Sequence, residues 1–306
     1  MGCEVEELPV AAPYSSAVLD PTRSLYVLET GDNPERTLAL AGEISGRHPN
    51  APLLVIAPDY RRALLLELLG GRTLNHIIAK QGAIAAGLPL IDETELIVTC
   101  SKLLTNDIFG LAKYLRLWGV EVCSPSLTRA ADRELVLSDL ARFLRVVDCR
   151  SAIAQAVVMT ADELLMNAIF NAPRREDGAP KYAHRNRQEK FELEERERVS
   201  VSYACDGRYI ALSVSDNFGS LSREVIFRYL RDSIEGRAAT MESKHGGAGL
   251  GIHMLSQAVT QLVFNVQPGV RTEVIALFYV RNGPRAFHEA GRSLNIFFTS
   301  TEGELL

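Results

Sequence analysis

The sequence has little of what marks several large protein classes. Its five cysteines are widely spaced and form no Cys-x-x-Cys pair, which excludes a small disulfide scaffold and favours reduced thiols. No uninterrupted apolar run reaches the about 18 residues of a membrane-spanning helix, and no charged and then apolar leader opens the chain. The net charge of −5 leaves no basic excess for non-specific binding of nucleic acid. We therefore expect a cytoplasmic protein with no membrane insertion and no nucleic-acid partner.

What the sequence does contain is typical of a globular protein. Its 306 residues are 47% hydrophobic and 23% charged, and a chain of this length accommodates about two domains of roughly 150 residues each. Such a chain buries roughly 70–75% of its unfolded surface on folding. It therefore needs neither a metal nor a disulfide to stabilise its core.

Strands and helices alternate in the first third of the chain. Short apolar runs at 25–28, 53–57 and 76–79 have the length and composition of buried strands, and helical patterns over 34–47 and 61–69 lie between them. This alternation predicts parallel βαβ units in an α/β fold.

Three segments of this region, LYVLET, HPNAPLLVIAP and NHIIAK, resemble the second half of a response-regulator receiver domain. Glu29 and Lys80 are 51 positions apart (80 − 29), similar to the separation of that family's phospho-acceptor Asp and its Lys. However, Glu29 replaces the acceptor, and Ala57-Pro58 replaces the switch Ser or Thr. The resemblance implies a truncated receiver-like unit over 1–88 that is not phosphorylated and serves in scaffolding, partner docking or homodimer formation. An unrelated small α/β unit is the alternative.

A helical linker is expected over 89–126. Apolar residues recur at three- and four-residue spacing over 91–118, and Asp92, followed three residues later by Glu95, has the pattern of a helix N-cap. Apolar residues at this spacing are more often core than partner surface. Ser124-Pro125-Ser126 marks the expected domain boundary, because Pro and Ser interrupt regular elements.

The pattern that indicates chemistry begins in a helix expected over 152–172. Glu163 and Asn167 are four residues apart, so their side chains lie on one helical face, and carboxylate and amide oxygens are ligands that Mg²⁺ accepts. A strand expected over 209–214 then runs into Asp216. A carboxylate in that place suits the exocyclic amine of adenine, although each pattern alone is also common in ordinary helices and turns.

A glycine cluster, GGAGLGI at 246–252, precedes an apolar helical pattern that extends to about Leu262. Glycines before a helix let backbone N–H groups approach phosphate, and the helix N-terminus favours negative charge. No Gly-Lys-Ser/Thr follows, so the cluster is not a Walker loop. Further on, GVRTEVIALF at 269–278 predicts a strand.

Taken in order, these four elements resemble the N, G1 and G2 boxes and the closing Gly-x-x-Thr strand of the GHKL ATPase superfamily. The resemblance covers about residues 130 to 280. It implies a two-layer α/β sandwich of the GHKL (Bergerat) type over 127–306, preceded by the shortened receiver-like unit and the helical linker. It also implies ATP and Mg²⁺ as cofactors.

The resemblance assigns roles to individual residues. Glu163 would orient or deprotonate the attacking group, and Asn167 would hold Mg²⁺, with Glu163 acting on the ion through water. Asp216 would bind adenine with support from Thr272. The other residues that it assigns to nucleotide binding are Asn171, Gly219, Lys244, Gly247, Gly249, Leu250 and Gly251.

The sequence departs from the superfamily pattern in ways that bear on catalysis. Gly219 follows Asp216 by three residues, where the pattern has two and four, and Phe170 stands where kinases often have a basic residue. No His lies between His76 and His184, so the phospho-accepting helical hairpin of a histidine kinase is not expected. The compact anti-sigma or serine-kinase type is the closest match.

The leading hypothesis is an ATP·Mg²⁺-binding bacterial signalling protein that phosphorylates Ser or Thr of a partner. The partner would be an anti-anti-sigma-like protein, a response regulator or a sigma factor. The alternative is a catalytically inactive module whose nucleotide occupancy sets its affinity for the partner.

Two further segments give structural expectations only. The run over 174–198 holds 15 charged residues, eight basic and seven acidic, and is typical of a solvated loop. The segment SLNIFFTS at 293–300 predicts an extra strand that caps a sheet edge or pairs with a partner.

Overall fold

A computed structural model gives the fold of most of the chain. It describes residues 25–30, 34–58, 74–81, 90–116, 119–182, 184–234, 259–280 and 291–299. The helix expected over 61–69 and the glycine cluster at 246–252 lie outside these residues.

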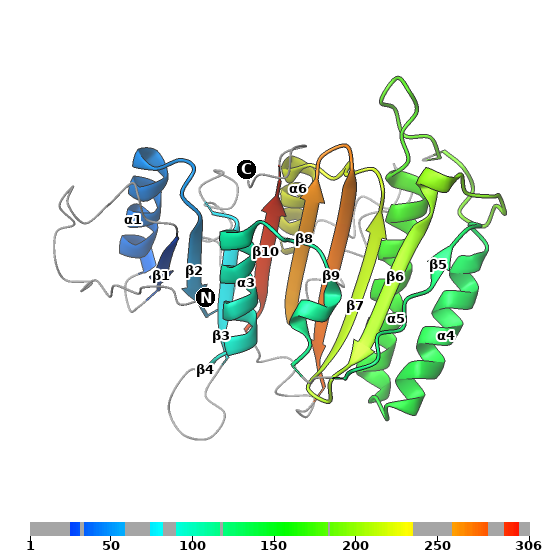
Figure 1. Cartoon of the computed structure of the whole chain (residues 1–306), viewed down its shortest axis with the longest axis horizontal. Coiled ribbons are helices and arrows are strands. Elements are labelled where there is room, and N and C mark those ends of the chain that lie inside the picture. The colour runs from blue at the N-terminus through cyan, green and yellow to red at the C-terminus, as the bar shows by residue number, and fades with distance from the viewer. Residues whose placement is uncertain are drawn as a thin grey trace.

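One ten-stranded mixed sheet runs through the molecule, in the order β1-β2-β3-β10-β8-β9-β7-β6-β5, with β4 paired to β3 (Figure 1). The strands are β1 (Tyr26–Glu29), β2 (Leu53–Ala57), β3 (His76–Gln81), β4 (Leu90–Ile91), β5 (Ser126–Leu127), β6 (Val199–Cys205), β7 (Tyr209–Asp216), β8 (Gln261–Gln267), β9 (Arg271–Tyr279) and β10 (Ser293–Phe298). The α-helices are α1 (Pro34–Arg47), α3 (Glu93–Thr105), α4 (Asp132–Val146), α5 (Ser151–Met166) and α6 (Arg223–Ile234).

The α/β class is confirmed, as are the three strands expected in the first third of the chain. β1 pairs with β2, and β2 with β3, in parallel. The helix expected between the first two strands is α1. For β1 and β2 the parallel pairing follows from the crossover through α1, because a short hairpin turn joins only antiparallel neighbours.

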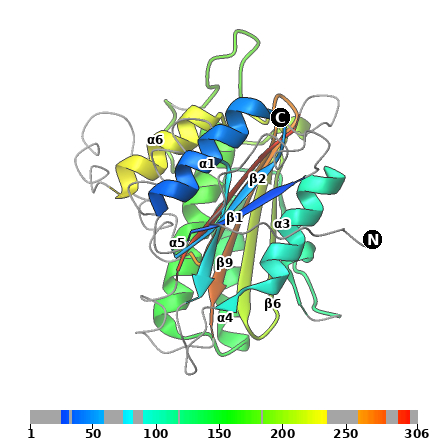
Figure 2. The same ribbon diagram turned by 90° about the vertical axis from the view of Figure 1, so that its left-hand side faces the viewer.

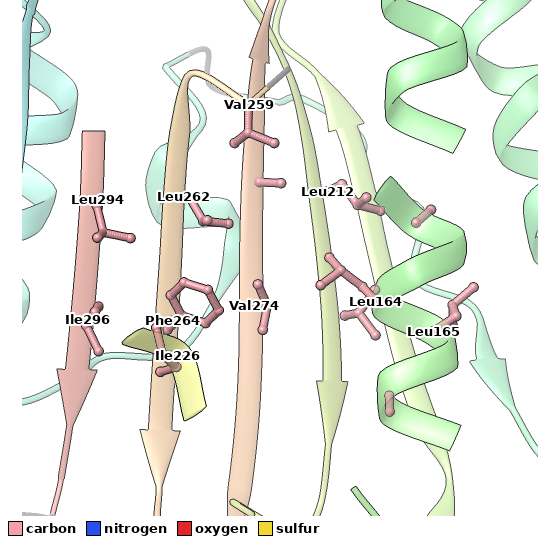
Figure 3. Packing of buried hydrophobic residues seen from close by; sticks show 14 of the residues in the cluster. Leu164, Leu165, Leu212, Ile226, Val259, Leu262, Phe264, Val274, Leu294 and Ile296 are labelled. Carbon is pink, nitrogen blue, oxygen red and sulfur yellow. The ribbon is translucent and has the colours of Figure 1, made fainter. Parts of the chain in front are cut away.

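Helices cover both faces of the sheet. Figure 2 shows α1, α4, α5 and α6 on one side of the strands and α3 on the other. The larger buried cluster lies on the first side, where α5 and α6 pack on β10, β8, β9 and β7 through residues such as Leu164, Leu165, Ile226, Phe264 and Ile296 (Figure 3). A second cluster lies under α3, between Val98 and Leu103 of the helix and Val263, Leu277 and Phe297 of the sheet.

The linker helix is shorter than the sequence suggested. Asp92 is the N-cap as expected, and its carboxylate accepts hydrogen bonds from the N–H groups of Thr94 and Glu95. The helix ends at Thr105, however, because Asn106 adopts a left-handed conformation with φ of 59°. The chain then turns back, and the 3₁₀ helix η1 (Leu111–Tyr114) buries Leu111 and Tyr114 against the sheet. The prediction of one helix to residue 118 is therefore wrong.

The start of β8 also differs from expectation. The helical pattern to about Leu262 is wrong at its end, because β8 begins at Gln261 and its residues are buried on both sides of the sheet. The strand expected over 293–300 is confirmed as β10, but the expectation that it caps a sheet edge is wrong. It lies between β8, to which it is parallel, and β3, to which it is antiparallel, and so joins the first three strands to the rest of the sheet.

One helix of the described chain, Ser151–Asn171, is long and apolar enough to cross a membrane by length and composition. In its most apolar window 56% of the residues are buried inside the protein. The helix is α5 with its π-helical extension, and its apolar side chains supply the main core. Its hydropathy therefore has a structural explanation.

Candidate functional site

Three polar side chains form a ladder at the end of α5. The Asn167 amide donates to Glu163 Oε1 at 3.4 Å, and the Asn171 amide donates to Asn167 Oδ1 at 2.8 Å. The last turn, η2 (Asn167–Asn171), is π-helical, and the Ala172 N–H donates to the carbonyl oxygen of Asn167. The stacking of Glu163 and Asn167 on one face is confirmed.

The environment of Glu163 tunes its acidity. Burial raises the pKa of this carboxyl to about 7, and the positive charge of Arg187 and the hydrogen bond from Asn167 oppose the rise. A carboxyl with a pKa near neutrality can both accept and release a proton under ordinary conditions, which suits general base chemistry.

Asp216 is the last residue of β7, and Thr272 is its cross-strand partner on β9. Alternate residues of a strand face the same side of the sheet. Leu212 and Val214 of β7 and Val274 and Ala276 of β9 belong to the main core, so Asp216 and Thr272 face the side that carries α5.

The carboxylate of Asp216 is buried and held by hydrogen bonds from the turn that follows it. It accepts a hydrogen bond from the N–H of Phe218 at 2.9 Å. Burial raises its pKa to about 6, although hydrogen bonds from the backbone of Phe218 and Gly219 oppose the rise. Within the described chain, the buried Thr272 Oγ1 has no hydrogen-bond partner of normal geometry, although the same hydroxyl weakly lowers the pKa of Asp216.

Gly219 is required by the backbone around Asp216. Its φ is +54°, and a Cβ at this position would lie 2.0 Å from the carbonyl oxygen of Gln267. Its own carbonyl accepts a hydrogen bond from the Gly269 N–H at 3.3 Å. The turn after Asp216 is thereby fixed against the β8–β9 hairpin, from which Thr272 follows.

The structure brings the two halves of this candidate site together. α5 packs on β7 and β9, and η2 packs on β7, so the ladder and the Asp216–Thr272 pair occupy neighbouring elements on one face of the sheet. The other predicted nucleotide-binding residues, Lys244, Gly247, Gly249, Leu250 and Gly251, lie outside the described residues.

No family model matches the chain, and no curated protein matches it.

The donor set fits a metal that arrives with phosphate better than a metal bound by protein alone. Among the residues that the structure describes, no group of three or more His, Cys, Asp or Glu side chains is arranged to hold an ion. Glu163 and Asn167 offer hard oxygen ligands, and Mg²⁺ commonly binds through one or two such groups with water and substrate phosphates completing its shell.

Phe170 does not act in place of the basic residue that kinases often have at this position. Its ring is buried, with 4% exposed, and meets Phe191 edge-on at a centroid distance of 5.8 Å. The ring therefore belongs to the core. Sequence spacing could not show this orientation, because the π-helical turn rotates residues 167–171 relative to a regular α-helix.

The segment 174–198 is irregular, as expected of a loop, but it is anchored. The Tyr182 ring packs against Phe191 in a tilted arrangement with centroids 4.6 Å apart, and the Tyr182 hydroxyl donates to the buried carboxylate of Glu197 at 3.0 Å. Lys181 pairs with the same carboxylate at 2.6 Å. The expectation of a merely solvated excursion is wrong for these residues.

Two basic residues near the site were not singled out by sequence. Arg187 opposes the rise in the pKa of Glu163 that burial causes, and Arg174 does the same for Asp216. Both come from the charged segment, where eight basic residues gave no signal to distinguish these two. Only the folded path of the segment shows which two of the eight basic residues lie near the site.

The receiver-like corner lies at the carboxyl ends of β1 and β3. The Lys80 ammonium pairs with Glu29 Oε1 at 2.5 Å and donates to the carbonyl oxygen of Thr30 at 3.1 Å. The two residues that the sequence comparison placed 51 positions apart are therefore in direct contact.

Proposed function

We propose that the chain binds ATP·Mg²⁺ on the α5 face of the sheet in the manner of the GHKL superfamily. The observation that supports this most is the buried Asp216–Thr272 pair. The Asp216 carboxylate accepts from backbone N–H groups on one side, and the exocyclic amine of adenine would be a further donor to it. The Thr272 hydroxyl beside it is suited to a ring nitrogen of the base or to a bridging water.

The arrangement of elements supports the finer fold assignment. The antiparallel β6, β7, β9 and β8 with α4, α5 and α6 on one face correspond to the two layers expected of a GHKL sandwich over 127–306. Placement of α3 on the other face is an addition to that plan.

The ladder at the end of α5 has the metal-related role. Asn167 would hold Mg²⁺ directly and Glu163 through water, while Asn171 orients the Asn167 amide through its 2.8 Å hydrogen bond. When bound, Mg²⁺ supplies charge neutralisation of the phosphates. The neighbouring Arg187 and Arg174 add positive charge from the protein.

For catalysis, we assign phosphorylation of a Ser or Thr hydroxyl on a partner signalling protein of the cytoplasm. Glu163 is the group to accept the hydroxyl proton, because its carboxyl has a pKa of about 7 and is half ionised near neutrality. The hydroxyl oxygen then attacks the γ-phosphorus, and ADP leaves. An anti-anti-sigma-like protein, a response regulator or a sigma factor is the expected class of partner.

A nucleotide-dependent binding module is the second candidate. It is favoured by the closure of the ladder on itself, since Asn167 Oδ1 already accepts from Asn171 and the Asn167 amide already donates to Glu163. A ladder that keeps these bonds would bind nucleotide and change partner affinity without turnover.

Labelled ATP with candidate partners separates the two candidates. We compare wild type with Glu163→Gln, which removes the charge at nearly constant shape, and with Glu134→Gln on the exposed face of α4 as the control. The kinase proposal expects normal ATP binding by Glu163→Gln with at least about a hundredfold loss of label transfer, and no loss in the control. If wild type and the control both bind ATP but neither transfers the label, the binding module is favoured.

A further inference from the structure

A layer of buried polar side chains lies under α3, on the face of the sheet opposite the candidate nucleotide site. Lys102, Glu95 and Asp92 are each at most 2% exposed. Charged residues are seldom buried to this extent unless they are paired. Apolar residues would have held α3 to the sheet at lower cost in desolvation, so this layer calls for a functional explanation.

The C-terminal end of α3 is fixed to β8 and β9. The Lys102 ammonium donates to Asn265 Oδ1 at 2.8 Å and to the Tyr114 hydroxyl at 3.0 Å. The Asn265 amide in turn donates to Glu273 Oε2 at 2.9 Å. Glu273 directly follows Thr272, the partner of Asp216, and faces the other side of the sheet.

Glu273 also holds the segment that follows α3. Its carboxylate accepts hydrogen bonds from the Gly110 N–H and from the Ser213 hydroxyl, both at 2.9 Å. One carboxylate on β9 thus ties together α3, the loop before η1 and β7. Any change in the position of α3 acts on the strand that carries Thr272.

The N-terminal half of α3 is fixed to the other part of the sheet. The Ser293 hydroxyl donates to Glu95 Oε2 at 3.0 Å, and the Asn295 amide donates to Glu95 Oε1 at 3.2 Å. Ser293 Oγ also accepts from the Ala79 N–H at 2.9 Å, and Ala79 precedes Lys80 of the receiver-like corner. Burial raises the pKa of Glu95 well above its usual range, and the hydrogen bonds from Ser293 and Asn295 oppose the rise.

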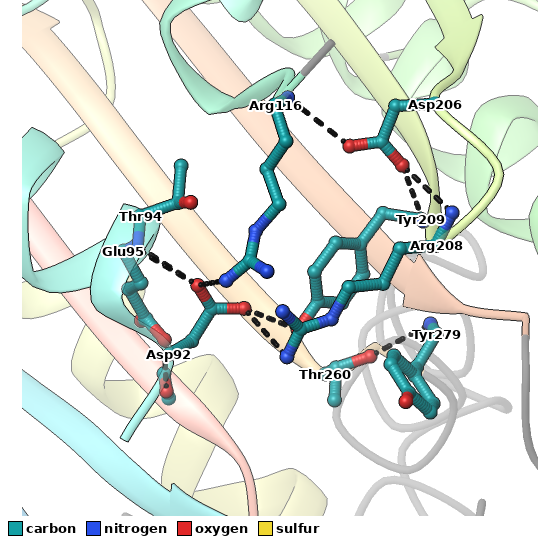
Figure 4. Close-up of polar contacts among 10 residues, drawn as sticks. Asp92, Thr94, Glu95, Arg116, Asp206, Arg208, Tyr209, Thr260 and Tyr279 are labelled. Carbon is teal, nitrogen blue, oxygen red and sulfur yellow. Dashed lines mark hydrogen bonds and ion pairs between the residues drawn. The ribbon is translucent and has the colours of Figure 1, made fainter. Parts of the chain in front are cut away.

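A third attachment holds the start of α3 to the β6–β7 hairpin (Figure 4). The Asp92 carboxylate pairs with Arg116 at 2.5 Å and Arg208 at 3.2 Å, and it accepts from the Tyr209 hydroxyl at 2.7 Å. Asp206 accepts hydrogen bonds from the N–H groups of Arg116 and Tyr209. The two ends of the segment 92–116 are thereby closed onto one hairpin.

The layer is also incompletely satisfied. Within the described part of the chain, Thr99 Oγ1 is buried without a hydrogen-bond partner. His76 and Asn295 meet with poor hydrogen-bond geometry, although Asn295 still opposes the fall in the pKa of His76 that burial causes. Such groups cost free energy in the arrangement seen, and an arrangement of α3 that gave them better partners would recover part of that cost.

We propose that α3 is a regulatory strap that couples the Glu29–Lys80 corner to the Asp216–Thr272 pair through Ser293, Glu95, Lys102 and Glu273. The part that concerns ATP depends on the function proposed above. Loss of the Glu29–Lys80 pair would loosen β3 against β10 and shift α3 through Ser293 and Glu95. The shift of α3 would then change the position of β9 through Lys102 and Glu273.

A double-mutant cycle tests the strap. Lys80→Ala breaks the corner, and the dissociation constant for ATP with Mg²⁺ is measured in wild type and in two backgrounds that cut the strap at opposite ends, Ser293→Ala and Lys102→Met. Ser101→Ala, on the exposed face of α3, is the control background. Circular dichroism checks that each variant is folded, and Ser293→Ala suffices if Lys102→Met does not fold.

The strap requires that Lys80→Ala weakens ATP binding by about fivefold or more in wild type and in the control. The effect must fall to within about twofold in a cut background, since the coupling is then absent. The proposal is overturned if Lys80→Ala does not weaken ATP binding in wild type, or if it weakens binding as much in the cut backgrounds as in wild type.

A readout without nucleotide keeps the strap separate from the ATP proposal. Hydrogen exchange of the amides over 271–274 is compared for the same variants. Lys80→Ala is expected to increase exchange there in wild type and not in Ser293→Ala. If wild type binds no ATP, the proposed function fails while this comparison still decides the strap, and equal exchange in all variants overturns it.

Discussion

At the scale of single residues, the buried carboxylate of Asp216 links ligand binding to stability. Its pKa is about 6 in the folded protein, against an ordinary value of 3.8. The favourable contribution of the protonated Asp216 carboxyl to stability is complete below pH 3.8 and is lost as the pH rises through about 6. At neutral pH the charged group therefore costs up to about 3 kcal/mol of folding free energy.

Asp216→Asn removes that cost and replaces the charged acceptor proposed for the adenine amine with a neutral amide, whose NH2 group can repel that amine. We expect this variant to be more stable than wild type at neutral pH by about 1–3 kcal/mol in urea unfolding, and to lose the difference near pH 4. It should bind ATP at least about tenfold more weakly. A variant that is less stable at neutral pH and binds ATP normally would contradict the role of Asp216.

Gly219 makes a prediction about backbone shape. Gly219→Ala places a methyl group against the Gln267 carbonyl and strains a φ of +54°, so we expect a loss of at least about 3 kcal/mol in unfolding free energy. Gly207→Ala is the matched control, because Gly207 has a φ of +79° with nothing within 4 Å of the added carbon. It should cost only about 1 kcal/mol. Equal losses would show that the close approach to Gln267 is unimportant.

At the scale of elements, the attachment of α3 depends on the charge of Lys102 being matched. Burial lowers the pKa of Lys102 to about 7, against the favourable charge of Glu273. Lys102→Met leaves Glu273 buried without its cation, so we expect a loss of about 3–5 kcal/mol. Adding Glu273→Gln should recover part of this loss in chemical unfolding. Additive losses in the double variant would mean that the two residues do not interact.

The elements that the sequence predicted are those with a strong hydrophobic period. The strands at 53–57 and 209–216, the helix that carries Glu163 and the capping of α3 by Asp92 all follow from local patterns. The burial of Lys102 and Glu95 under α3 does not, because charged residues are normally exposed and their partners are far away in the sequence. Lys102 and Asn265 are separated by 163 residues.

The candidate site was predictable to a similar degree. Glu163, Asn167, Asp216 and Thr272 were predicted because the order of their elements along the chain resembles the GHKL boxes, although each pattern alone is common. Arg187 was not, because it reaches the site through an anchored irregular segment. Local patterns carry no information on such a path.

At the scale of the whole molecule, β10 joins both parts of the sheet. The main buried cluster includes Tyr26 and Leu53 of the first strands together with Leu294 and Ile296 of β10. The chain should therefore unfold as one cooperative unit, although its sequence reads as two parts with a linker. A single heat-absorption transition in calorimetry is expected, and two separate transitions would contradict this.

Removal of residues 1–88 gives a sharper form of the same prediction. It deletes β1–β3 and exposes one edge of β10, together with part of the core. We expect the remaining chain to be destabilised and to aggregate, since an unpaired apolar strand edge is a template for association. A monomeric product with the stability of the full chain would show that the first three strands are dispensable.

The proposed nucleotide site is built on Asp216 and Thr272. Its most direct test is calorimetric titration of the full chain with ATP in the presence of Mg²⁺, with Asp216→Asn measured in parallel. We expect saturable binding by wild type with a dissociation constant below about 1 mM, and binding by Asp216→Asn that is at least about tenfold weaker. No binding by wild type at millimolar nucleotide, or equal binding by the two proteins, would contradict it.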